Sequence, residues 1–98
     1  MEKAEVLEIL KRQGWEPAPP GYPALAKKAF GLREAWAWYQ GRLLTFEFYS
    51  GTHNVAEGAS AVVQSEEDVV QAVQYAEKRI NESFYMRFLA PPCRGEDA

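Results

Sequence analysis

The only histidine of the chain lies in a polar segment between two predicted strands. Residues 50–58 read Ser-Gly-Thr-His-Asn-Val-Ala-Glu-Gly, so His53 is accompanied by hydroxyl, amide and carboxylate groups. A histidine beside a carboxylate and a hydroxyl can transfer protons or activate a nucleophile. One histidine without a fixed second partner meets few requirements of an active site, and turn-forming residues are also ordinary in a hairpin connection. The segment is the candidate ligand-binding loop, with candidate residues Ser50, Thr52, His53, Asn54 and Glu57.

A metal or cofactor site finds little support in the remaining residue types. His53 and Cys93 are the only histidine and the only cysteine, and neither has a spaced partner that could complete a zinc ligand set. The acidic run at 66–68 lacks the spacing of a calcium loop, and the glycines form neither a dinucleotide-binding fingerprint nor a P-loop. The sequence therefore predicts no catalytic residue, no metal and no cofactor, and the balance is against an enzyme.

A second group of residues suits contact with another molecule rather than chemistry. The predicted C-terminal helix ends in an apolar cluster, in which Phe84 and Phe88 continue the core stripe. Tyr85, Met86 and Leu89 of the same cluster cannot all point in one direction. A helix end that is apolar all round is usually buried on more than one side. A second copy or the N-terminal segments could provide that cover, and a small chain gains from added buried surface. The candidate self-association interface is Tyr85, Met86 and Leu89.

The composition places these candidates in one small globular domain. The chain has 98 residues, 47% of them hydrophobic and 13% aromatic, which is too apolar for a disordered chain. We expect a domain at 1–90 and a flexible C-terminal tail at 91–98. The net charge of −3 gives no general attraction to nucleic acid or to an anionic membrane. A charged start, a single cysteine and no apolar run near about 20 residues predict a cytoplasmic protein without membrane contact.

Helical patterns are predicted at both ends of the chain, with a shorter one between them. Residues 2–13 carry an apolar stripe at helical spacing, followed by a glycine that suits a C-terminal cap. Residues 23–30 start with proline and are followed by glycine, which favours a short helix. A long helix begins after Ser65, whose side chain can cap it together with Asp68, and runs to about residue 88. Its core stripe is Val69, Val73, Ala76, Ile80 and Phe84.

The strongest strand signal is a hairpin formed by residues 32–38 and 42–49. A loop of residues 39–41 ends on a glycine at the left-handed position of a bulged turn, and it pairs Arg33 with Glu47. A two-residue loop of glutamine and glycine would instead put the glutamine at a positive φ. The predicted core face is then Leu32, Trp36, Trp38, Leu44, Phe46 and Phe48.

A third strand and an extended segment complete the expected fold. Residues 59–64 read as the third strand. Residues 15–23 contain four prolines and cannot be helical, and we expect Trp15 and Tyr22 to hold them against the domain. The predicted fold class is α+β, a three-stranded antiparallel meander packed by an N-terminal helix and a long C-terminal helix, in the order α-α-β-β-β-α.

Three functions are compatible with these residues. The scarcity of catalytic groups favours a non-catalytic protein-interaction or binding module that self-associates as a homo-oligomer. A small ligand-binding protein or enzyme would use the loop 50–58, for a small molecule that the sequence does not identify. Nucleic-acid binding is disfavoured, because the aromatic rings of the hairpin are assigned to the core. It would need four basic residues on one face beside exposed rings, namely Lys27, Lys28, Arg33 and Arg42.

Overall fold

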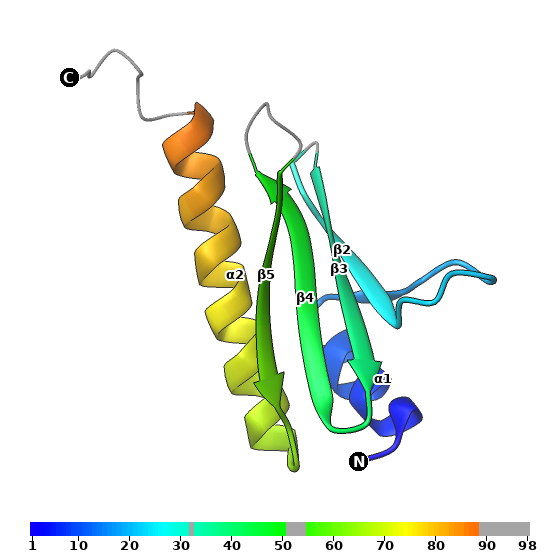
Figure 1. The fold of residues 1–98 in the computed structure, drawn as a ribbon. Coiled ribbons are helices and arrows are strands. Elements are labelled where there is room, and N and C mark those ends of the chain that lie inside the picture. Colours follow the sequence, from blue (N-terminus) through cyan, green and yellow to red (C-terminus); the bar gives the residue numbers. More distant parts are fainter. Residues whose placement is uncertain (32, 51–54, 89–98) are drawn as a thin grey trace.

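The chain folds into an antiparallel sheet of five strands and two helices, which confirms the α+β class (Figure 1). This computed structural model describes residues 1–31, 33–50 and 55–88, so Leu32 and the predicted tail lie outside the described residues. The elements in chain order are α1 (Lys3–Arg12), β1 (Glu16–Pro17), β2 (Ala26–Phe30), β3 (Arg33–Gln40), β4 (Leu43–Ser50), β5 (Val55–Val62) and α2 (Glu66–Phe88).

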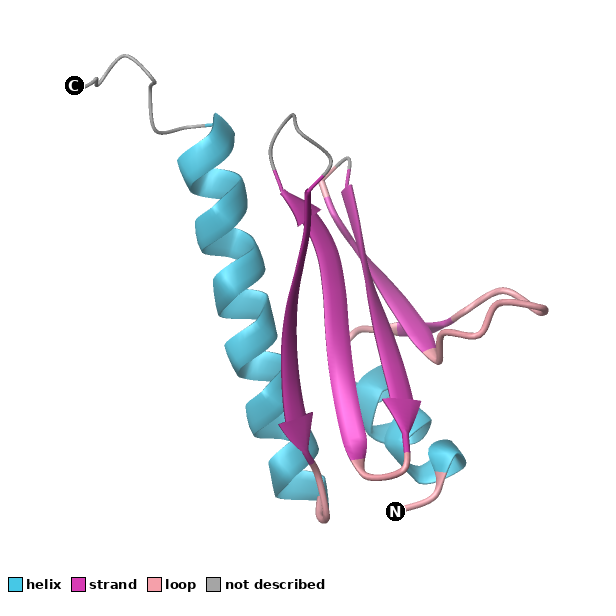
Figure 2. Cartoon of the chain, in the orientation of Figure 1, coloured by secondary structure: helices cyan, strands magenta, loops and turns pink. Residues whose placement is uncertain are grey.

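The sheet is a simple meander, because each strand pairs antiparallel with the next one along the chain (Figure 2). The sheet has five strands instead of the predicted three, and the short helix predicted at 23–30 does not form. Residues 26–30 instead form β2, which pairs with β3, and the two-residue β1 pairs with β2. Pairing with β3 outweighs the helix propensity of the alanines and lysines in this segment, since propensity is a weak preference that tertiary contacts override.

The hairpin of β3 and β4 has a different register from the predicted one. Gln40 pairs with Leu43, so only Gly41 and one further residue form the loop. Gly41 has a φ of 66°, which suits the first loop position of a tight hairpin turn. The predicted three-residue loop and the pairing of Arg33 with Glu47 are therefore wrong.

This register reverses the two faces of β3. Side chains alternate across a strand, so a shift of one residue exchanges its inner and outer faces. Ala35 and Ala37 are fully buried, whereas Trp36 and Trp38 lie on the other face and are only partly buried. The prediction that the two tryptophans belong to the core is wrong. The core residues predicted for β4 are confirmed: Leu44, Phe46 and Phe48.

The core lies between one face of the sheet and both helices. α2 packs on β4 and β5, and α1 packs against α2 behind the strands (Figure 1). Trp15, directly after α1, is buried with its ring centroid 5.2 Å from that of Phe46. The helical contribution to the core includes most of the predicted stripe: Val6, Ile9, Leu10, Val69, Val73, Ala76 and Ile80.

Local sequence signals set the helix ends. The N–H of Asp68 donates to the hydroxyl of Ser65 at 3.2 Å, and the Asp68 carboxylate accepts from the N–H of Gln64 at 2.9 Å. Gly14 has a φ of 95° directly after the C-cap residue of α1. The capping predictions at Ser65 and Gly14 are thus confirmed.

Candidate functional site

The face of the sheet that points away from the helices carries aromatic and aliphatic side chains, and no described helix covers it. We call this surface the open face. Leu43 and Val62 lie opposite each other on it and are 44% and 61% exposed. The strand pairings place on this face Lys27, Glu34, Trp36, Trp38, Leu43, Thr45, Glu47, Ser60 and Val62.

A stacked pair of aromatic rings lies on the open face. Tyr22 stacks on Trp36 with ring centroids 5.2 Å apart and an interplanar angle of 2°. The Lys27 ammonium lies 5.8 Å from the centroid of the Trp36 ring. Tyr22 belongs to the proline-rich segment, so this segment is held by Tyr22 on the open face and by Trp15 in the core, as predicted. Tyr22 remains 56% exposed in this stack.

The charges around the stack are mainly negative. Lys27 pairs with Glu16 across β1 and β2, and its ammonium lies 3.3 Å from the carboxylate of Glu34. Glu47 lies beside Trp36 on β4. Three glutamates and one lysine therefore lie on the strands around this stack, and this surface favours a positively charged partner over a phosphate backbone.

The structure does not bring the four predicted nucleic-acid-binding residues to one face. Lys27 lies on the open face, whereas the register places Lys28 and Arg33 on the side of the helices. Arg42 lies in the hairpin loop after Gly41. The aromatic rings of the open face thus lack the basic surroundings that a nucleic acid would need.

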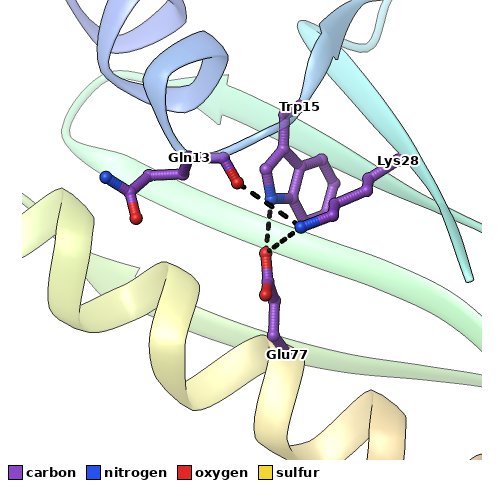
Figure 3. Close-up of polar contacts among 4 residues, drawn as sticks. All are labelled: Gln13, Trp15, Lys28 and Glu77. Atoms are coloured by element: carbon purple, nitrogen blue, oxygen red, sulfur yellow. Dashed lines mark hydrogen bonds and ion pairs between the residues drawn. The ribbon is translucent and has the colours of Figure 1, made fainter.

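On the helix side, Lys28 takes part in a polar cluster that joins three segments (Figure 3). One carboxylate oxygen of Glu77 accepts from the Trp15 indole N–H at 3.0 Å and from the Lys28 ammonium at 3.0 Å. The ammonium also donates to the carbonyl of Gln13 at 3.4 Å. About a quarter of each charged side chain is exposed, 26% for Lys28 and 25% for Glu77. These mutually satisfied groups hold α2 against β2 and the end of α1.

A small pocket of about 170 Å³, including its open mouth, lies where β5 meets α2. We call it the edge groove. Tyr75 from α2 borders it and is 57% exposed. Since β5 is the last strand of the sheet, the groove lies next to a free strand edge. Its lining residues are Phe46, Ala59, Ser60, Ala61, Ala72 and Tyr75.

Three of the five candidate residues of the predicted ligand-binding loop lie outside the described residues. This applies to Thr52, His53 and Asn54. Ser50 ends β4 and pairs with Val55, and Glu57 pairs with Phe48 within β5. The ligand-binding loop stays a prediction.

The predicted interface likewise stays a prediction. Tyr85 and Met86 belong to the last turns of α2, and Leu89 lies outside the described residues. Sequence reasoning assigned Trp36 to the core face, which is wrong, and gave Tyr75 no role. The alternation Ala-Trp-Ala-Trp at 35–38 indicates one large and one small face of β3, and the face with the large side chains was wrongly predicted to be the buried one.

Within the part of the chain that the structure describes, no three His, Cys, Asp or Glu side chains gather in a way that could hold a metal ion. No described helix is long and apolar enough to cross a membrane. Neither a family model, nor a curated protein, nor a solved structure matches this chain.

Proposed function

We propose that this chain is a non-catalytic protein-interaction module that binds its partner through the open face. The observation that carries the proposal is the Tyr22–Trp36 stack, which presents an exposed aromatic ring on a sheet face without a covering helix. Aromatic residues combine a large contact area with few rotatable bonds, and they are enriched at the centres of protein interfaces.

The charges of the open face define the chemistry of the partner. Glu16, Glu34 and Glu47 outnumber Lys27, so a contact surface that is apolar and carries an excess of lysine or arginine is complementary. An arginine or lysine side chain could lie against the exposed tyrosine ring and gain a cation–π contact. Leu43 and Val62 extend the apolar part of the surface toward the β5 edge.

Selection from a display library of random peptides tests this proposal with a defined probe. We expect the selected peptides to combine basic and apolar residues and to bind the wild-type protein in a titration calorimeter. Tyr22→Ala and Trp36→Ala should weaken their binding by about tenfold or more, since centrally placed aromatic residues dominate binding free energies. The affinity should also fall with added salt.

Tyr75→Ala is the matched control, because Tyr75 is a tyrosine of almost equal exposure, 57% against 56%, that borders the edge groove instead. Circular dichroism should show that all variants remain folded. Peptides that bind Tyr22→Ala and wild type equally well, or a library that yields no binder, would contradict a binding role of the open face.

A further inference from the structure

The two edges of the sheet are protected very differently. β1 is two residues long and contains Pro17, which cannot donate a backbone hydrogen bond. Short edge strands and prolines are common ways in which proteins prevent unwanted strand pairing. β5 has eight residues, and its residues 58–62 include neither a proline nor a charged side chain. Only the β5 edge is therefore suited to receive another strand.

The hydrogen-bonding pattern shows which backbone groups point to this free edge. The N–H of Val63 donates to the carbonyl of Arg42 at 2.8 Å, so residue 63 is directed toward β4. Because this direction alternates along an antiparallel strand, the N–H and C=O groups of Gly58, Ser60 and Val62 point away from β4. These outward groups form no backbone hydrogen bond with the rest of the described chain.

The surface of α2 beside this edge carries a charge pattern that is complementary to itself. Tyr75 borders the edge groove, and the Arg79 guanidinium lies 6.0 Å from the centroid of its ring. Asp68 lies seven positions before Tyr75, and Arg79 four positions after it, so all three share one side of the helix. Asp68 and Arg79 are separated by about 16 Å at 1.5 Å per residue.

We propose that β5 pairs antiparallel with β5 of a second copy of this chain, which joins the two sheets into one continuous sheet. A two-fold axis near Ser60 would place the α2 helices antiparallel to each other on the same side. Asp68 of one copy would then face Arg79 of the other, in two equivalent ion pairs. This charge complementarity favours a second copy over an unrelated strand, and the edge groove would receive side chains from the added strand.

This dimer goes beyond the proposed function, because it uses a different surface from the open face. It also differs from the interface predicted at Tyr85, Met86 and Leu89. Both open faces would lie on the same side of the joined sheet, so that one dimer could bind two basic sites with the gain of bivalent attachment.

Sedimentation equilibrium at micromolar concentration tests the proposal on the whole chain. We expect the wild-type protein to be a dimer. Ser60→Pro removes an outward N–H and leaves the backbone hydrogen bonds to β4 in place; the only contact to β4 that it removes among those described is the exposed hydrogen bond from the Ser60 hydroxyl to the Thr45 hydroxyl at 3.1 Å. It should therefore weaken the dimer by about tenfold or more and leave the fold intact. Arg79→Glu would bring two acidic side chains together and should weaken the dimer as well, most strongly at low salt.

The outcomes separate this inference from the proposed function. Tyr22→Ala should leave the dimer unchanged, and a dimer that Tyr22→Ala abolishes would mean that copies associate through the open face. A wild-type monomer would overturn the proposal, as would a dimer that neither Ser60→Pro nor Arg79→Glu weakens. If Ser60→Pro fails to fold, the sedimentation equilibrium of Arg79→Glu tests the proposed dimer instead, because this variant changes a side chain on the helix surface.

Discussion

Glu77 is the residue on which three distant segments converge. Its carboxylate accepts hydrogen bonds from Trp15 and Lys28, which come from the end of α1 and from β2. Glu77→Ala would leave a partly buried ammonium without its counter-charge and an indole N–H without its acceptor. We expect a loss of about 2 kcal/mol in the free energy of unfolding, measured by urea denaturation.

Glu66→Ala is the matched control for Glu77→Ala. Glu66 also belongs to α2 and forms an ion pair with α1, to Arg12 at 3.3 Å, but both side chains are more than half exposed. Exposed ion pairs contribute little, so this variant should lose less than about 1 kcal/mol. Equal losses in the two variants would mean that the polar cluster contributes no more than a surface pair.

At the scale of single residues, interactions between near neighbours in the sequence could be predicted, whereas contacts between residues far apart in the sequence could not. The cap at Ser65 and the glycine at position 14 depend on neighbours within a few positions, and both are confirmed. The bond between Trp15 and Glu77 joins residues 62 positions apart. No periodicity or turn signal links such residues, because their contact arises only when α2 packs against the sheet.

At the scale of an element, the β3–β4 turn makes Gly41 sensitive to substitution. Its φ of 66° is a conformation that side chains with a Cβ rarely adopt, although a Cβ there would meet no atom within 4 Å. Gly41→Ala should therefore lower the free energy of unfolding by about 1 kcal/mol through backbone strain alone. Thermal unfolding followed by circular dichroism measures this loss.

Gly41→Asn is the informative comparison, because asparagine tolerates the left-handed conformation better than alanine does. We expect it to retain more stability than Gly41→Ala. A loss that is equal in both variants would indicate a steric cause and would argue against the observed turn geometry.

The same turn explains why the faces of β3 could not be predicted. The sequence indicates a hairpin with a glycine in its loop, but a loop of two residues and a loop of three residues give opposite faces. The predicted loop gained a favourable pair of Arg33 with Glu47. The observed one buries Ala35 and Ala37, which are small enough to leave room in the core for the ring of Trp15. That choice depends on packing of the whole core, which strand periodicity does not contain.

At the scale of the whole molecule, one side of the sheet is covered by both helices and the other side is open. The three tryptophans are divided between the two sides, with Trp15 in the core at 3% exposure and Trp36 and Trp38 on the open face. Collisional quenching of tryptophan fluorescence therefore distinguishes the observed register from the predicted one. In the predicted register, Trp36 and Trp38 would be shielded as well.

A pair of variants makes this measurement specific. Trp15→Phe retains only the two open-face tryptophans, and we expect acrylamide to quench its fluorescence readily. The double variant Trp36→Phe and Trp38→Phe retains only Trp15, whose emission should lie at shorter wavelength and resist quenching. In urea, acrylamide should quench the tryptophans of the two unfolded variants equally well, which controls for differences in quenching that do not come from the fold. Strong shielding of Trp36 and Trp38 from acrylamide in a variant shown to be monomeric would mean that they face the core. Shielding that appears only when a basic peptide is added would instead locate the partner on the open face.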